Sequence, residues 1–223
     1  MKILIPVLAI CLGLLSGCSK DDPQPQTGFL RVLHGVANAP AVEVRVNGTL
    51  LGTIGSYSLS LPYSAVNAGS ATVQVRLQGT ATDFLSTPVN VTANGYSTLI
   101  LADSAAKLKT SVVVEDPVPA SGKAKINIYH LGTVASAASF TSNGAVISAN
   151  RTFNDQQSNG ALVAYTNVDA GSFVLESRQP GTSGSTGLIG TSTRTLEAGK
   201  SYTYIFRNPV PPSNIPSFTF ISN

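Results

Sequence analysis

Hydrophobic and polar residues alternate with a period of two in several segments of the chain. The clearest segment is VEVRV at 42–46, and the same alternation recurs at 73–78, 89–92 and 202–207. This period directs one set of side chains into a core and the other toward solvent, and it predicts half-buried β-strands. The best helical candidate, 102–109, is short and has no clear caps. The pattern therefore predicts an all-β protein.

Similar segments occur in the same order in the two halves of the chain. The pairs are 30–34 with 126–130 and 47–48 with 143–144, at an offset of 96, and 63–70 with 165–172, at an offset of 102. The additional residues of the second half are expected in the loop at 151–160. The Asn-Gly pairs predict two-residue hairpin turns, because a type I′ turn requires a positive φ at both positions.

The N-terminal segment has the pattern of a targeting signal. Lys2 precedes an apolar run over 3–15, which is short for a membrane-spanning helix and typical of a signal peptide. The run ends in LSGC at 15–18, which resembles the lipobox of bacterial lipoproteins, where the thiol of Cys18 would receive a diacylglyceryl group. Two or three acyl chains anchor a protein stably, so Cys18 predicts a membrane anchor. An uncleaved anchor helix is the alternative.

Charged residues follow Cys18 closely. Lys20, Asp21 and Asp22 resemble the surface-export signal of Bacteroidetes lipoproteins, and Ser19 replaces the Asp that would retain an enterobacterial lipoprotein at the inner membrane. The segment PQPQT at 23–27 then predicts a stiff spacer. We expect an outer-membrane, lipid-anchored protein that faces the cell exterior. The alternative is that residues 20–22 are only a solvated tether.

A proline-rich joint, DPVPASG at 116–122, separates the two halves. Each half has its own short strands and turn signals, at the spacing of a β-sandwich. The expected division is 1–17 for the signal peptide, 18–28 for the lipidated cysteine and tether, 29–115 for the first sandwich, 116–122 for the linker and 123–223 for the second sandwich.

Composition excludes several classes of function. The 223 residues carry 14 Lys+Arg and 11 Asp+Glu, a net charge of +3, which is too weak and dispersed for a nucleic-acid partner. Cys11 lies in the predicted signal peptide and Cys18 is the predicted lipid site. The mature chain would therefore have no free thiol, which excludes disulfides, thiolate zinc sites and a cysteine nucleophile.

The segment HGVANAPAVEVRVNG at 34–48 carries a resemblance to a known family. It is similar to the opening of the bacterial domain of unknown function numbered 4397, in which a strand ending in His precedes an Ala/Pro turn and a valine-rich strand. The segment at 63–69 also resembles that family, whereas 131–136 in the second half lacks the proline. The resemblance covers most of 29–115 and implies an immunoglobulin-like domain of secreted or surface proteins, without an established activity. The expected fold is thus two tandem immunoglobulin-like β-sandwich domains after a lipoprotein signal peptide.

The two histidines, His34 and His130, occupy equivalent positions in the two halves. Their place on the inward face of a strand predicts a structural role, in which each imidazole hydrogen-bonds the backbone of the next turn. Metal binding is disfavoured, because each half offers one His without a second ligand at a suitable spacing. A general base is disfavoured too, because no serine or carboxylate partner is identifiable.

Other candidate motifs also favour structural interpretations. The glycines of 181–190 recur without the strand, helix and Lys of a phosphate-binding loop, and they predict a hairpin loop, with ligand contact as the alternative. Glu115 and Asp116, at the joint, could stabilise an interdomain ion, but solvated charge is favoured. Paired catalytic carboxylates and a G-x-S-x-G motif are absent from the sequence. We expect no catalytic residues, no metal and no cofactor, and hence no enzyme.

Two classes of function remain open. One is a non-catalytic binding or adhesion module whose loops contact an unknown protein or glycan; the absence of Trp weakens the glycan case. The other is a structural or accessory envelope lipoprotein that spaces or supports another assembly. Asp103-Ser104-Ala105 resembles the Bacteroidetes O-glycosylation motif, which makes Ser104 a candidate for modification.

Overall fold

The structure is a computed structural model that describes residues 25–36, 40–55, 60–103, 107–133, 137–158, 164–209 and 216–222. The first half forms β1 (Thr27–His34), β2 (Val42–Val46), β3 (Thr49–Ile54), β4 (Ser64–Asn67), β5 (Gly69–Leu77), β6 (Asp83–Val91), β7 (Tyr96–Ala102) and β8 (Lys109–Glu115). The second forms β9 (Lys123–Leu131), β10 (Ala137–Ser142), β11 (Ala145–Thr152), the 3₁₀ turn η2 (Asp155–Gln157), β12 (Thr166–Asp169), β13 (Gly171–Arg178), β14 (Leu188–Leu196), β15 (Ser201–Arg207) and β16 (Ser217–Ser222).

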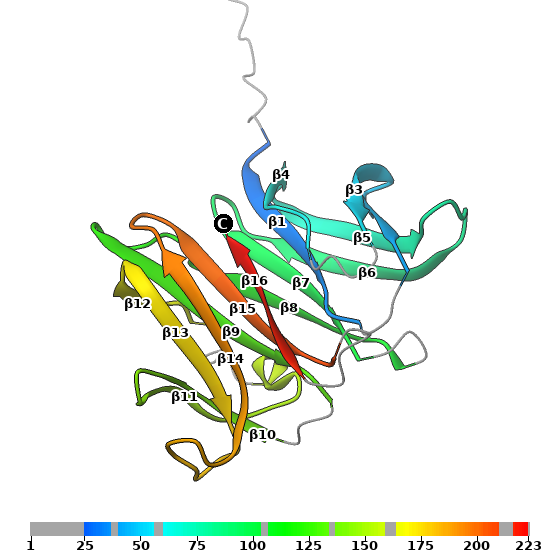
Figure 1. Ribbon diagram of the computed structural model, residues 1–223. Helices are drawn as coiled ribbons and strands as arrows, with labels where there is room; N and C mark the ends of the chain where they lie inside the picture. The colour runs from blue at the N-terminus through cyan, green and yellow to red at the C-terminus, as the bar shows by residue number, and fades with distance from the viewer. Residues whose placement is uncertain are drawn as a thin grey trace, which may run out of the picture.

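These strands form two β-sandwich domains with the same strand order (Figure 1). The first domain has the sheets β4-β1-β7-β8 and β3-β2-β5-β6, and the second has β12-β9-β15-β16 and β11-β10-β13-β14. Each strand of the second domain thus takes the place of the strand eight positions earlier in the first. The predicted all-β fold with two sandwiches is confirmed. In both domains the first and seventh strands pair in parallel.

Each sandwich has its own apolar core, and the sequence alternation explains how it forms. The valines of β2, Val42, Val44 and Val46, are buried against β5 residues such as Val73 and Val75. The core of the second sandwich is richer in aromatic rings, with Phe140, Phe173, Tyr202, Tyr204 and Phe206. Burial of these side chains supplies the main stabilising free energy of each domain, about 1.5–3 kcal/mol for a large apolar side chain.

The two Asn-Gly pairs form the predicted hairpin turns. Asn47 and Gly48 connect β2 to β3 with φ values of 49° and 82°. Asn143 and Gly144 connect β10 to β11 with φ values of 48° and 80°. Asparagine and glycine tolerate this left-handed backbone, and their turn fixes the register of the two strands that it joins.

The prediction of a helix over 102–109 is wrong, because both ends of this segment belong to strands. Ala102 is the last residue of β7 and Lys109 is the first residue of β8, while 104–106 lie outside the described residues. β7 and β8 extend into the segment, where Ala102 pairs with Lys109, because this cross-strand pairing outweighs the weak helix propensity of the segment. Among the described residues, no helix is long and apolar enough to pass through a membrane.

The loop predicted to hold additional residues contains a local ion pair. β11 ends at Thr152 and η2 follows directly, whereas the equivalent β3 ends at Ile54. Arg151 Nη2 is 2.8 Å from Asp155 Oδ1, and Arg151 Nη1 donates a hydrogen bond to the Ile128 carbonyl at 3.0 Å. These contacts fasten the longer loop to β9.

Candidate functional site

The central strands of both sandwiches bury both of their faces. In β1, Leu30 and Val32 belong to the core of the first sandwich, yet Arg31 between them is also 0% exposed. A separate apolar cluster contains residues of both domains: Leu33, Ile100, Ala102, Val113, Tyr129, Leu131 and Ile205. The sheets β4-β1-β7-β8 and β12-β9-β15-β16 therefore contact each other, and they join the two sandwiches (Figure 1).

A buried ion pair lies in this interface. Arg31 Nη2 is 3.0 Å from Glu115 Oε2 and 3.2 Å from Oε1, and both side chains are 0% exposed. Arg31 Nε donates to the Thr98 hydroxyl at 3.1 Å, and Nη1 donates to Thr203 of the second domain at 3.3 Å. Two charges taken out of water destabilise a fold unless they are fully paired, so the surrounding hydrogen bonds are essential to this arrangement.

Hydroxyl groups from both domains complete the hydrogen bonding of Glu115. Tyr129 of the second domain donates its hydroxyl proton to Glu115 Oε1 at 2.6 Å. Tyr63 and Thr98 of the first domain donate to Oε2. Burial, with the negative charge of Glu115 added to it, raises the pKa of Tyr63 and Tyr129 well above the ordinary value. Both hydroxyls therefore remain protonated donors at neutral pH.

Arg31 also contacts the aligned tyrosines of the two halves. Its guanidinium lies 4.6 Å from the ring centroid of Tyr63. The Tyr165 hydroxyl is 2.7 Å from the hydroxyl of Thr203, the residue to which Arg31 also donates. Burial alone would lower the pKa of Arg31, but the attraction of Glu115 and the neighbouring tyrosines raises it above its ordinary value. The guanidinium is thus a fixed positive charge that links the two domains.

At the joint between the two halves, Glu115 differs from the prediction that its charge is solvated. The sequence favours solvated charge for both Glu115 and Asp116, but the Glu115 side chain is buried and pairs with Arg31. The side chain of Asp116 is 78% exposed and accepts from Lys125 Nζ at 2.7 Å, a contact that lowers the pKa of this carboxyl. Strand alternation explains the difference, because consecutive residues at the end of β8 point to opposite sides.

The linker after β8 is fastened to the second domain. Lys125, in β9, also donates from Nζ to the Val118 carbonyl at 2.9 Å. The Ala120 amide donates to Asn167 Oδ1 of β12 at 3.1 Å. Pro117 is buried, whereas Val118 is 58% exposed. The linker therefore has a fixed path along one edge of the interface.

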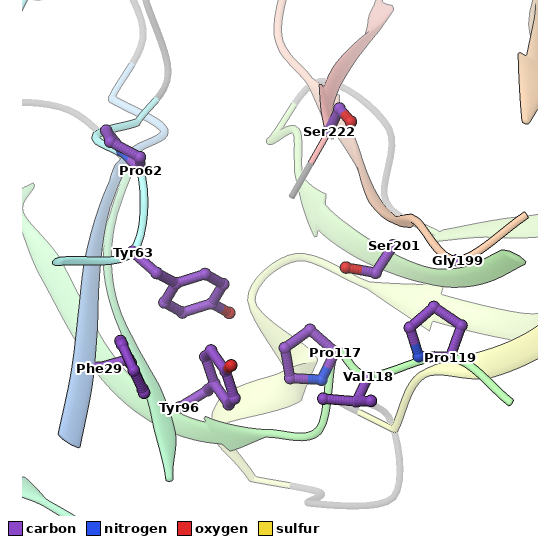
Figure 2. Close-up of a pocket in the computed structure, with 10 residues that line it drawn as sticks. All are labelled: Phe29, Pro62, Tyr63, Tyr96, Pro117, Val118, Pro119, Gly199, Ser201 and Ser222. Atoms are coloured by element: carbon purple, nitrogen blue, oxygen red, sulfur yellow. The ribbon is translucent and has the colours of Figure 1, made fainter. Parts of the chain in front are cut away.

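Above this path the interface opens into a groove of about 540 Å³ (Figure 2). Its lining residues come from both domains and the linker: Phe29, Pro62, Tyr63, Tyr96, Pro117, Val118, Pro119, Gly199, Ser201 and Ser222. Figure 2 shows Phe29, Tyr63 and Tyr96 on one side, Gly199, Ser201 and Ser222 on the opposite side, and Pro117 and Val118 between them. All of these residues are uncharged. We call this site the aromatic groove.

Three aromatic rings of the first domain pack together in the aromatic groove. Phe29 and Tyr96 are stacked, with ring centroids 4.9 Å apart and planes at 15°. Tyr63 meets Tyr96 edge-on, with centroids 5.0 Å apart and planes at 77°. Since the Tyr63 hydroxyl is held by Glu115, the buried ion pair fixes one wall of the aromatic groove.

Several predicted site residues lie outside the described residues. These are Cys18, the predicted lipid site; Lys20, Asp21 and Asp22, the predicted export signal; and Ser104, the candidate for O-glycosylation.

His34 and His130 occupy equivalent positions near the ends of β1 and β9, as predicted from the repeat. Both are buried, and none of their ring nitrogens has a hydrogen-bond partner among the described residues. Residues 37–39 and 134–136 of the turns that follow lie outside the described residues, so the bond to the next turn stays a prediction. Burial lowers the pKa of His34, and an interaction with the Pro40 backbone offsets this in part. Burial also lowers the pKa of His130, to about 4. Both imidazoles are neutral at pH 7.

The glycine-rich segment forms the hairpin loop that the sequence predicts. It connects β13 to β14, with positive φ values at Gly181, Gly184 and Gly187, and Arg178 donates to the Gly184 carbonyl. Within the part of the chain that the structure describes, no cluster of three or more His, Cys, Asp or Glu side chains could hold a metal ion.

Sequence reasoning missed both the ion pair and the aromatic groove. The signal for the ion pair was present, because Arg31 is the one polar residue of the segment FLRVL at 29–33. Tyr63 and Tyr165 also recur at the same place in the repeat. Their meeting across the interface could not be inferred from one sequence, since it depends on how the two sandwiches pack.

The fold and the groove define a two-domain β-sandwich protein with a neutral, aromatic interdomain site. The family described as "Domain of unknown function (DUF4397)" matches residues 28–141, and the chain belongs to this family. The match extends beyond the resemblance predicted for 29–115, through the linker and into β9 and β10. A search of curated proteins found no match.

Solved structures give only remote similarities. A leucine-rich repeat protein from Bacteroides thetaiotaomicron is 14% identical, with a TM-score of 0.24; the match covers 85% of this chain and 26% of that protein. The pneumococcal glycogen-degrading virulence factor SpuA is 13% identical, with a TM-score of 0.26 and coverages of 81% and 21%. A family 26 carbohydrate-binding module of Eubacterium rectale Amy13K, solved with maltoheptaose, is 10% identical, with a TM-score of 0.29 and coverages of 87% and 97%.

Proposed function

We propose that this protein is a lipid-anchored, non-catalytic binding module that binds a neutral glycan in the aromatic groove. The observation that carries the proposal is the aromatic groove itself, which combines Phe29, Tyr63 and Tyr96 with serine hydroxyls and no charge. Aromatic rings offer apolar faces to sugar rings, and hydroxyl groups can exchange hydrogen bonds with them. An uncharged lining disfavours phosphorylated or strongly acidic ligands.

The rigid interface supports this proposal. Residues from both domains line the aromatic groove, so its width depends on how the two sandwiches are held together. Arg31 and Glu115, with the hydroxyls of Tyr129 and Thr203, fix that relationship before any ligand binds. A preformed site loses less conformational entropy on binding, which increases affinity.

The cell-surface location is proposed from the sequence. Cys18 would carry the lipid, and Lys20, Asp21 and Asp22 would direct export to the exterior of the outer membrane. The short tether would then hold the aromatic groove close to the cell surface. In the same proposal, 123–223 is a divergent second copy of the family domain, supported by its identical strand order.

A glycan array tests the binding function directly. The chain from Ser19 to Asn223 should bind a neutral oligosaccharide, and Tyr96→Ala should reduce the affinity at least about tenfold through loss of ring contact. Val146→Ala is a matched control, because Val146 is an apolar residue, 64% exposed, outside the aromatic groove. Equal loss of binding in both variants, or binding that Tyr96→Ala leaves unchanged, would disprove a role of the aromatic groove.

A structural or accessory role is the second candidate. The buried contacts between the sandwiches favour it, because two domains held firmly together suit a spacer better than two domains on a flexible joint. This role predicts that the protein binds no glycan on the array. It also predicts that envelope proteins co-purify with it after crosslinking in cells. Specific glycan binding that depends on Tyr96 would exclude it as the main function.

Modification of Ser104 is a separate proposal. The Asp103-Ser104-Ala105 motif predicts an O-linked glycan on the protein expressed in its own host. Mass spectrometry of the intact protein should show an added glycan that Ser104→Ala removes. An unmodified wild-type mass would reject the motif.

A further inference from the structure

The His34 side chain is a buried polar group that the aromatic groove does not use. It lies at the end of β1, five residues beyond Phe29, and it is 5% exposed. Neither of its ring nitrogens has a hydrogen-bond partner among the described residues. Buried donors and acceptors are normally satisfied, so a group beyond the described residues or a bound ligand must complete the hydrogen bonding of this imidazole.

An apolar cavity of about 200 Å³ adjoins this imidazole. Val36 and Val42 line its buried side, and Leu77 and Phe84 lie at its rim with 41% and 44% exposure. Apart from His34, all of its lining side chains are apolar. An engineered apolar cavity of about 150 Å³ binds benzene, so this one can hold a substituted ring. We call it the His34 pocket.

The equivalent position in the second domain provides an internal comparison. His130 is enclosed by aromatic rings, with Phe206 at 5.0 Å and Phe140 at 6.3 Å between ring centroids. By strand register, Phe206 corresponds to Leu101, the partner of His34 in β7. By the offset of 96, Phe140 corresponds to Val44. Smaller side chains thus surround His34, and its domain has an open cavity at the imidazole.

We propose that the His34 pocket binds a small alcohol or phenol whose hydroxyl group hydrogen-bonds to the His34 imidazole. A neutral imidazole offers one donor and one acceptor, and a hydroxyl group can satisfy either. The apolar walls would enclose the hydrocarbon part of the ligand. This inference goes beyond the proposed glycan function, because the His34 pocket shares no lining residue with the aromatic groove.

The ligand class can be tested with p-cresol and toluene, which differ by one hydroxyl group. Titration of the chain from Ser19 to Asn223 should give a Kd of about 1 mM or tighter for p-cresol. Toluene should bind about 5- to 10-fold more weakly, because it lacks the hydrogen bond. The chain has 2 histidines, so the ¹⁵N signals of the His34 ring should shift while those of His130 act as an internal reference.

Two variants separate the hydrogen bond from the cavity. His34→Leu should bind both probes equally, and Leu77→Trp, at the exposed rim, should block both. Val146→Trp, outside the pocket, should leave both affinities unchanged. The proposal is overturned if p-cresol fails to bind, if toluene binds as tightly as p-cresol, or if Leu77→Trp binds p-cresol like wild type. Leu77→Trp and the ring signals remain decisive if His34→Leu does not fold.

Discussion

Tyr129 of the second domain donates its hydroxyl proton to the Glu115 carboxylate of the first, with 2.6 Å between the two oxygens. Glu115 also holds Arg31, so one carboxylate connects a cation of β1 to a hydroxyl of β9. Both Tyr129 and Glu115 are buried in the interface. These contacts hold the two sandwiches together, and residues on both sides of their interface line the aromatic groove.

Removal of the negative charge at this point should destabilise the protein. Glu115→Gln keeps the size of the side chain but leaves the buried Arg31 cation without its counter-charge, which should cost about 3–5 kcal/mol. Urea unfolding monitored by circular dichroism measures the loss. The double variant Arg31→Met/Glu115→Leu should recover most of it, because an apolar pair of similar volume needs no counter-charge. A loss below about 1 kcal/mol in Glu115→Gln would contradict the buried pair.

The first domain should be less stable alone than in the whole chain. A fragment of residues 25–115 would expose Leu33, Ile100 and Val113, which the second domain covers. We expect its Tm to lie about 5–10 °C below that of the whole chain. Differential scanning calorimetry should also show one transition for the whole chain, because the interface couples the domains. Two separate transitions, one at the Tm of the fragment, would show that the domains unfold independently.

Stability should depend on pH through His130. The unfolded chain has the ordinary histidine pKa of about 6.5, whereas burial holds the folded pKa at about 4. Protons therefore bind the unfolded state preferentially, and stability should fall by up to about 3 kcal/mol as the pH drops from 6.5 to 4. Urea unfolding across this range measures the slope. His130→Phe should remove most of it, and an unchanged slope would place the titration elsewhere.

The first Asn-Gly turn should tolerate a β-branched residue poorly. Asn47 has a φ of 49°, which valine adopts only with strain, so Asn47→Val should destabilise the first domain by about 1 kcal/mol or more. Thr49→Val is the matched control, because Thr49 is an exposed residue of the adjacent strand β3. Thermal unfolding distinguishes them, and equal Tm values for the two variants would contradict the turn geometry.

Substitutions in the predicted lipid anchor and in the predicted export signal should have different effects on localisation. Cys18→Ala should abolish palmitate labelling and stable membrane association, because it removes the acylated thiol. Alanine at Lys20, Asp21 and Asp22 should preserve membrane association but remove sensitivity to protease added to whole cells. Membrane association that persists in Cys18→Ala would reject the lipid anchor. Unchanged surface exposure in the triple variant would make residues 20–22 an ordinary tether.

The sequence by itself determined the local structure. Alternation in segments such as 42–46 and 202–207 predicted strands, since the strand period is the same wherever the strand lies. The Asn-Gly pairs predicted two hairpins, because positive φ is a local requirement. The repeat offsets predicted that His34 and His130 would be equivalent. Each of these features depends on residues that are close together in the chain or on a repeated pattern.

Only the tertiary structure decided what the polar faces of the central strands contact. Period-two alternation separates two faces of a strand, but it cannot distinguish a face exposed to water from one covered by another domain. The alternation therefore predicts solvent exposure for Arg31, Thr98 and Thr203, although all three are fully buried in the interface. Their burial follows from the packing of two sheets whose strands lie up to 172 residues apart in the sequence. The aromatic groove, with its walls from two domains, exists only because of that packing.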